Sequence, residues 1–248
     1  MAAHRGSTVD AAEVDRFAAI APEWWNEKGA FRPLHRLNPA RIEYIRDRLA
    51  AHFERDIKTR APFAGLSLLD IGCGGGLICE PMARLGFTVT GIDADATALG
   101  VARAHAHAQG LGIDYRGDDA EDLAARGRRF DAVSALEVVE HAADARLFIT
   151  TAASLVKPSG ALILSTINRT PKAYATAIIG AEYLLRWLPR GTHEYRKFRR
   201  PSELARDVRG AGLLVGDIRG LAYEPWRDRW HQSSDLGVNY LLFATLPK

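Results

Sequence analysis

Four glycines within five positions, Gly72 and Gly74–Gly76, constrain the fold of this chain more than any other feature. They follow the apolar run Leu68–Ile71, and a second apolar run ends at Asp93, about twenty residues later. Glycine lets a backbone turn sharply and approach a ligand closely. An acid at that distance is placed to accept hydrogen bonds from ribose hydroxyls. The pattern predicts a strand, a ligand-binding loop and a helix. An ordinary tight strand–helix turn, which binds no ligand, is the alternative.

The loop does not match the dinucleotide-binding fingerprint. That motif, G-x-G-x-x-G, fits Gly72 and Gly74 but requires a glycine where this chain has Leu77. A nicotinamide-dependent enzyme is therefore disfavoured.

Apolar segments of strand and helix length alternate along the middle of the chain. Such alternation predicts an α/β fold with a doubly wound, mostly parallel sheet. The expected strands are 66–71, 88–92, 113–116, 131–135, 161–166, 213–221 and 240–246, and the expected helices are 77–85, 95–109 and 144–155. Two further helices are expected in an N-terminal helical arm over residues 1–56, one at 10–25 and one beginning at Asn38-Pro39, a cap residue followed by proline. The catalytic domain is expected over 57–248.

Composition sets outer limits on function. A formal charge of only +3 over 248 residues gives no overall reason to expect a nucleic-acid partner. The two cysteines, Cys73 and Cys79, are a poor disulfide framework, so a reducing, cytoplasmic compartment is expected. The chain has no stretch of about twenty uninterrupted apolar residues, so the sequence does not predict a membrane-spanning helix.

Ligands of open α/β sheets bind at the carboxyl ends of the strands. The candidates there are Asp70, near the end of the first predicted strand, and the loop glycines Gly72 and Gly74. They are followed by Asp93, Asp119 and Leu136, each after a later predicted strand. A ligand carboxylate would call for a guanidinium, for which Arg41 is a candidate. An ordinary solvated arginine at position 41 is the alternative.

Glu137, Glu140 and His141 form a second cluster directly after a predicted strand. If this turn is helical, the three side chains share one face. Two carboxylates and an imidazole could hold a divalent cation such as Mg²⁺. His141, next to Glu140, could instead act as a general base without a metal, and a half-exposed turn with neither role is the third alternative.

With Asp70 two residues before Gly72, the glycine loop resembles the S-adenosylmethionine loop of class I methyltransferases. The chain from Trp24 to Tyr240 resembles the bacterial ubiquinone-biosynthesis O-methyltransferases. The matching runs are Trp24-Trp25, Phe31–Arg41, the glycine loop, Glu137–His141, Leu155–Pro158, Ser165–Arg169, Gly180–Tyr183, Gly191–Glu194, Lys197-Phe198 and Val238–Tyr240. The runs 33–36 and 180–183 are the most specific of them.

That resemblance implies a Rossmann-like fold whose sheet has seven strands, the last antiparallel. It implies S-adenosylmethionine contacts at Arg41, Gly72, Asp93 and Leu136, and a divalent cation at the cluster of Glu137, Glu140 and His141. The implied substrates are polyprenyl phenols and the demethylated quinol, with other quinone-pathway enzymes as possible partners. A methyltransferase for a smaller soluble phenol and a non-catalytic S-adenosylmethionine-binding protein are the alternatives.

Residues 170–200 interrupt the alternation of strands and helices. Residues 174–188 are apolar nearly all round, and a basic run with Arg196, Lys197, Arg199 and Arg200 follows. We expect a helical lid insertion. It either packs over the active site or docks on an anionic membrane surface at the inner face of the cell membrane.

Overall fold

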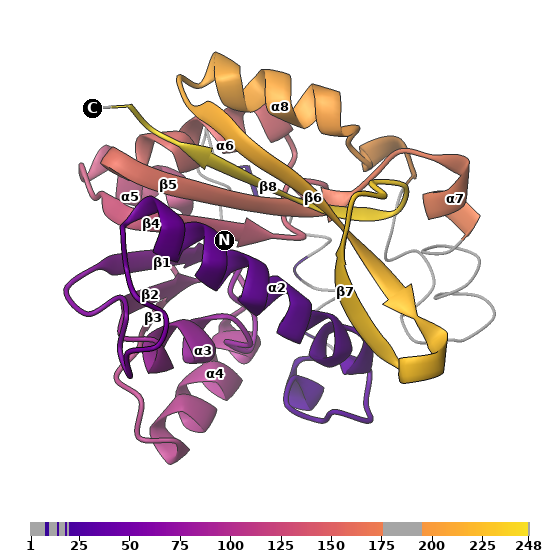
Figure 1. Ribbon diagram of the computed structural model, residues 1–248. Helices are drawn as coiled ribbons and strands as arrows, with labels where there is room; N and C mark the ends of the chain where they lie inside the picture. The colour runs from indigo at the N-terminus through magenta and orange to yellow at the C-terminus, as the bar shows by residue number, and fades with distance from the viewer. Residues whose placement is uncertain (1–7, 10–13, 15–17, 19, 176–194, 248) are drawn as a thin grey trace.

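The computed structural model describes residues 8, 9, 14, 18, 20–175 and 195–247. Its centre is one mixed sheet in the strand order β3-β2-β1-β4-β5-β8-β6-β7 (Figure 1). In chain order the strands are β1 Ser67–Ile71, β2 Thr88–Ile92, β3 Asp114–Arg116, β4 Phe130–Leu136, β5 Val156–Ile167, β6 Leu214–Glu224, β7 Arg229–Ser233 and β8 Asn239–Thr245. The first five are mutually parallel, as the alternation predicts.

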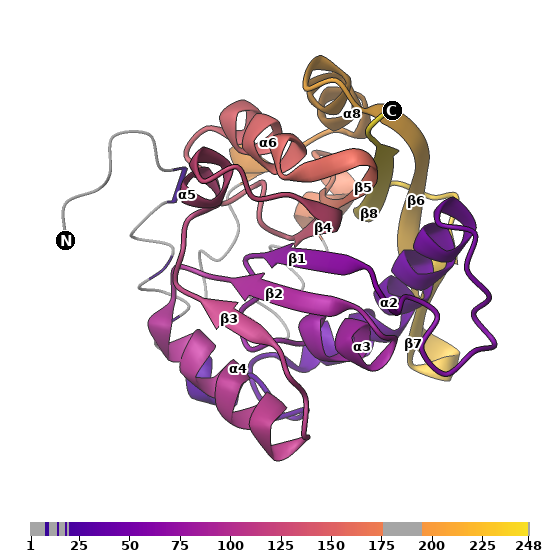
Figure 2. The same ribbon diagram turned by 90° about the vertical axis from the view of Figure 1, so that its left-hand side faces the viewer.

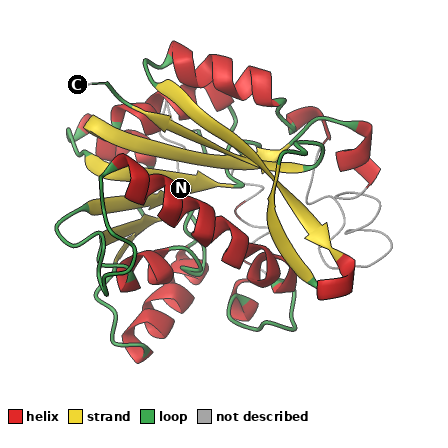
Figure 3. Cartoon of the chain, viewed as in Figure 1, coloured by secondary structure: helices red, strands yellow, loops and turns green. Residues whose placement is uncertain are grey.

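The described part of the sheet has eight strands, so the expectation of seven is wrong by one. β8 is antiparallel to both β5 and β6, and the additional strand, β7, pairs antiparallel with β6. β6 and β7 form a long hairpin that projects beyond the other strands (Figure 3). The segment Arg229–Ser233 has no apolar alternation, because Trp230 is its only large apolar residue, and its strand therefore left no sequence signal.

Helices cover both faces of the sheet (Figure 2). One face carries α2, α3 and α4, and the other carries α5, α6 and α8. Their bounds are α2 Arg32–His52, α3 Cys79–Arg84, α4 Ala96–Ala108, α5 Ala120–Ala125, α6 Ala145–Ser154 and α8 Pro201–Gly210; the short elements are η1 Ala21–Glu23, α7 Pro171–Ala173, η3 Tyr195–Lys197 and η4 Pro225–Arg227. Two separate apolar cores result, one on each face.

The predicted start of α2 is wrong. The helix begins at Arg32, six residues before Asn38-Pro39, with Pro33 in its first turn. Pro39 lies inside the helix, where it cannot donate a backbone hydrogen bond. The helix continues through it because its next turns bury Tyr44, Ile45 and Leu49 against the sheet. Tertiary packing outweighs the local capping signal here.

The expected helix at 10–25 lies mostly outside the described residues. Its described end is the 3₁₀ turn η1, followed by turns at Trp24 and Trp25 rather than by α-helix. The expected apolar helix at 174–188 also lies outside the described residues, apart from its first two positions. In the described part of the chain, no helix is both long and apolar enough to cross a bilayer.

Candidate active site at the carboxyl edge of the sheet

The glycine loop between β1 and α3 has the predicted strand–loop–helix form. The backbone N–H groups of Gly72 and Cys73 both donate to the carbonyl oxygen of Ile92, at 2.8 and 3.0 Å. Gly72 has a φ of +70°, a conformation that residues with side chains rarely adopt. A Cβ atom at Gly72 would come within 2.5 Å of Val138 Cγ2. The loop is thus a narrow cradle between the ends of β1 and β4.

Asp93 connects the end of β2 to this loop. Its Oδ2 accepts a hydrogen bond from the Gly74 backbone N–H at 2.7 Å, and its Oδ1 accepts one from the Asp95 N–H at 2.9 Å. Burial raises the pKa of Asp93, and the two backbone bonds oppose that rise. Asp119 lies at the N-cap of α5 and Leu136 is the last residue of β4. The predicted cofactor residues therefore meet at one edge, as parallel strands require.

Asp93→Ala is expected to weaken binding of S-adenosylhomocysteine tenfold or more. The variant lacks the carboxylate proposed to accept two ribose hydroxyl hydrogen bonds, worth about 1.5–3 kcal/mol each. Calorimetric titration measures this, with Asp114→Ala, at an exposed aspartate on the edge strand β3, as the matched control. Equal dissociation constants for the Asp93 variant and the wild type would rule out the ribose contact.

Asp70 lies in β1, two residues before the first glycine of the loop. Its side chain is buried, with Oδ1 accepting from Ser134 Oγ at 2.7 Å and Oδ2 accepting from Cys79 Sγ at 3.4 Å. Burial raises the pKa of this carboxyl to about 6. These contacts join β1 to β4 and to α3, and the predicted contact of Asp70 with the cofactor stays a prediction.

Asp70→Asn is expected to make the protein more stable at neutral pH. Between about pH 4 and pH 6 the folded protein still holds the Asp70 proton while the unfolded chain has released it, so the wild type loses stability as pH rises. Asparagine does not titrate. The unfolding free energy of the variant minus that of the wild type should therefore grow by about 2–3 kcal/mol from pH 4 to pH 7. Denaturant titrations across this range test it, and a constant difference would contradict it.

Arg41 is buried, so the alternative of a solvated surface arginine is wrong. Its Nη2 donates to Glu137 Oε1 at 2.6 Å, which joins α2 to the end of β4. Its Nε is also buried and has no hydrogen-bond partner among the described residues. A buried donor without a partner is costly, and a ligand carboxylate would satisfy it. Together with the cradle at Gly72, this fits the predicted binding of an amino-acid-bearing cofactor.

Glu137 to His141 form a single turn rather than a helix. The His141 N–H donates to the Val138 carbonyl at 2.9 Å, and Glu137 has a φ of +57°, which is strained for a residue other than glycine. The premise that the three side chains share a helical face is therefore wrong. Glu140 is buried and its Oε2 accepts from Thr166 Oγ1 at 2.8 Å, whereas His141 is only partly buried.

The two carboxyls of this turn have opposite pKa shifts. Burial alone would raise the pKa of Glu137, but Arg41 and the hydrogen bonds from Asn239 and Ser165 hold it below its usual range. Burial, and then repulsion from Glu137, raises the pKa of Glu140 well above its usual range.

The donor set does not fit a divalent cation in this conformation. Glu137 Oε1 already accepts from Arg41, from Ser165 at 2.7 Å and from Asn239 at 2.8 Å. Over the described residues, no group of three or more acidic, histidine or cysteine side chains is arranged to hold a metal. The predicted cation therefore stays a prediction.

Two residues that sequence reasoning gave no role lie on the glycine loop. Trp24 packs against Gly74 and Gly75, and Trp25 Nε1 donates to the Gly75 carbonyl at 2.9 Å. Their sequence signal is the pair of adjacent tryptophans, which is one of the runs that resemble the ubiquinone-biosynthesis O-methyltransferases but which carries no role by itself.

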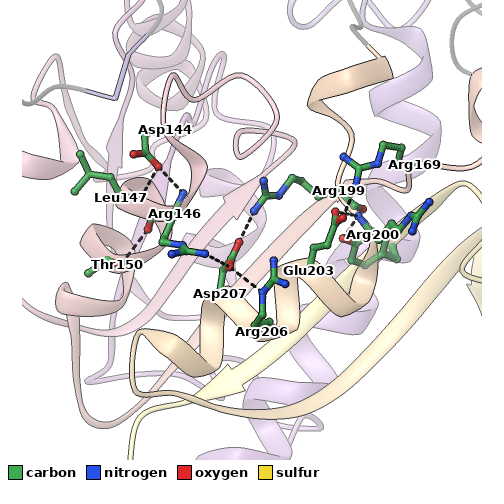
Figure 4. A network of polar contacts seen from close by, with 11 residues as sticks. Asp144, Arg146, Leu147, Thr150, Arg169, Arg199, Arg200, Glu203, Arg206 and Asp207 are labelled. Carbon is green, nitrogen blue, oxygen red and sulfur yellow. Dashed lines mark hydrogen bonds and ion pairs between the residues drawn. The ribbon is translucent and has the colours of Figure 1, made fainter.

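The end of the 170–200 region is anchored to α8. Asp207 is buried and pairs with Arg199, while Arg146 and Arg206 lie at 3.8 and 3.6 Å (Figure 4). The Arg199 N–H also donates to the Ile167 carbonyl at 3.1 Å. Arg199 belongs to the basic run that is predicted to contact an anionic membrane, but in the structure its side chain pairs with Asp207.

The comparisons agree with this geometry. Residues 35–215 match the family model described as methyltransferase domain. Magnesium protoporphyrin IX methyltransferase from Synechocystis PCC 6803, solved with bound SAH, has the same fold, with a TM-score of 0.63 at 19% identity over 94% of this chain and 96% of that one. Fold, loop and family model define an S-adenosylmethionine-dependent methyltransferase.

Relatives with higher sequence identity show to which family of methyltransferases the chain belongs. The ubiquinone biosynthesis O-methyltransferase of Chelativorans sp. (strain BNC1) is 56% identical over 98% of this chain and 96% of its own length. That of Mesorhizobium japonicum is 54% identical over 97% of this chain and 96% of its own. The chain belongs to the ubiquinone biosynthesis O-methyltransferases.

Proposed function

We propose that this enzyme transfers a methyl group from S-adenosylmethionine to a catechol-type hydroxyl on a polyprenylated ring in ubiquinone biosynthesis. The substrates are 2-polyprenyl-6-hydroxyphenol and 3-demethylubiquinol. The observation that carries the proposal is the 52–56% identity to relatives of that name over nearly the whole chain. The intact cofactor cradle and the Glu137–His141 turn beside it are consistent with turnover.

S-Adenosylmethionine supplies an electrophilic methyl group when it is bound. Gly72 and Gly74 would allow close approach of the cofactor, Asp93 would bind its ribose and Arg41 would bind its carboxylate. A phenol has a pKa of roughly 10, so only about one part in a thousand is ionised at neutral pH, and its deprotonation accounts for roughly 4 kcal/mol of the barrier. His141 takes that proton as general base, and the turn that carries it positions the acceptor oxygen.

A turnover assay tests the proposed function. The purified enzyme is incubated with S-adenosylmethionine and either a short-chain prenyl catechol or the same catechol without its prenyl chain, and products are identified by mass spectrometry. We expect methylation with a clear preference for the prenylated ring. Equal or better use of the bare catechol would favour the soluble-phenol alternative. Cofactor binding with no turnover of either ring would favour a non-catalytic protein.

We further propose that residues 170–200 dock on an anionic membrane at its cytoplasmic face, where a polyprenyl substrate lies and where other quinone-pathway enzymes could meet this one. Aromatic side chains such as Tyr174 and Trp187 favour membrane interfaces. Tyr174 is exposed and its ring lies 5.4 Å from that of Tyr195. Basic residues near a surface contribute about 1 kcal/mol each, although the pairing of Arg199 with Asp207 reduces their number.

Flotation with liposomes tests the membrane proposal. Wild-type protein is compared with a variant in which Ile178, Ile179, Leu184 and Leu185 are changed to serine, with and without anionic lipid. We expect only the wild type to float, and only with anionic lipid. Equal flotation of the two proteins would refute the docking role of this segment.

A further inference from the structure

The indole of Trp24 lies directly on two glycines of the cofactor loop. A Cβ atom at Gly74 would come within 2.4 Å of Trp24 Cζ2, and one at Gly75 would come within 2.4 Å of Trp24 Cγ. Both distances are far below any real contact of a Cβ atom, so the ring spans the pair at van der Waals range. The φ angle of Gly75 is not positive, so its backbone conformation does not require glycine. Its lack of a side chain is explained by the indole that covers it.

Neighbouring contacts fix the two tryptophans in this position. The Trp24 ring stacks on Phe31, with centroids 3.8 Å apart and planes inclined by 12°. The Trp25 ring stacks on His105 of α4 at 3.6 Å and 7°, and its Nε1 donates to the Gly75 carbonyl at 2.9 Å. His105 Nδ1 in turn lies 2.6 Å from Oε1 of the buried Glu80 in α3. The loop is therefore held from the N-terminal segment and from two helices.

We infer that Trp24 and Trp25 are positioning residues of the cofactor site, acting as a clamp on Gly74–Gly75. The Gly74 N–H donates to Asp93, so a loop held at Gly74 keeps that carboxylate in place for the ribose. A site fixed before binding avoids the entropy of ordering the loop when the cofactor arrives. Both tryptophans precede residue 35, where the methyltransferase family match begins. The N-terminal segment is thus part of the cofactor site of this chain.

Calorimetric binding of S-adenosylhomocysteine to the full chain tests the clamp. Trp24→Ala is expected to bind about tenfold more weakly, and Trp24→Phe, which keeps a flat ring for Phe31 to stack on, should stay within about threefold of the wild type. Trp226→Ala is the matched control, because that tryptophan is 89% exposed on η4. Wild-type affinity in Trp24→Ala, or equal losses in the alanine and phenylalanine variants, would overturn the inference.

A double-mutant cycle separates the clamp from a general loss of stability. Gly75→Ala displaces the indole from the loop and should weaken binding about as much as Trp24→Ala does, whereas adding it to Trp24→Ala should cost less than twofold more. Hydrogen exchange without ligand should quicken at residues 72–76 in both single variants and stay unchanged in β4 and β5. Independent, additive losses, or faster exchange throughout the sheet, would refute the clamp. If Trp24→Ala does not fold, the cycle is made with Trp24→Phe, Gly75→Ala and the double variant Trp24→Phe/Gly75→Ala, in which the smaller ring should make Gly75→Ala cost less than it does in the wild type.

Discussion

His141→Ala is expected to lower kcat at neutral pH by roughly 10²- to 10⁴-fold, the usual contribution of a general base. Affinity for S-adenosylhomocysteine should change little, because His141 is proposed to act on the acceptor hydroxyl rather than to bind the cofactor. As pH rises toward the phenol pKa of about 10, the substrate ionises by itself and the activity of the variant should recover. Steady-state rates with the short-chain prenyl catechol from pH 6 to 9 measure this.

The same variant distinguishes a base from a metal ligand. If His141 is a plain base, the wild type keeps its activity in chelator. If it is a ligand, chelator abolishes wild-type activity and Mg²⁺ or a similar ion restores it, in spite of the hydrogen bonds that occupy Glu137 in this structure. Full activity of His141→Ala at neutral pH would reject both roles.

Arg41→Ala is expected to destabilise the fold by about 3 kcal/mol, because it removes one partner of a largely buried ion pair and leaves the Glu137 carboxylate with only neutral donors. Arg46→Ala is the matched control. It lies on the same helix, is partly exposed and pairs, among the described residues, with its neighbour Asp47, so its loss should stay within about 0.5 kcal/mol. Denaturant unfolding of the three proteins tests this, and equal stabilities would show that the Arg41 pair is unimportant to the fold.

Arg41→Ala should also weaken S-adenosylmethionine more than a decarboxylated analogue, because the guanidinium is proposed to meet the carboxylate. The comparison is made at a temperature where the variant is fully folded, so that lost stability does not enter the result. Equal losses for the two ligands would place the carboxylate elsewhere.

Local patterns predicted the parts of the fold that local forces determine. The local pattern predicts β2 at its observed bounds, Thr88–Ile92, because Asp93 follows the segment and a glycine turn precedes it. For α2 the local pattern predicts a start six residues too late, because Asn38-Pro39 resembles a helix cap. In the structure Asn38 is buried, and the helix is stabilised by packing on the sheet.

The contacts that complete the site could not be predicted locally. Arg41 and Glu137 are 96 positions apart, and Trp25 and Gly75 are 50 apart. The sequence pattern of a single helix or strand cannot predict contacts between residues so far apart in the chain. Strand ends alone did predict that Asp93, Asp119 and Leu136 share an edge, because parallel strands bring their carboxyl ends together.

The hydrogen bond between the Arg199 N–H and the Ile167 carbonyl has an evolutionary consequence. The chain leaves the sheet at the end of β5 and returns to the same point after about thirty residues. The segment between these two points is therefore an insertion whose ends lie side by side. Loop-closure cost grows slowly with length, by roughly 0.6 kcal/mol per doubling. Lineages can therefore lengthen, shorten or exchange this interval with little effect on the sheet. Substrate range can diverge there while the methyl-donor site stays unchanged.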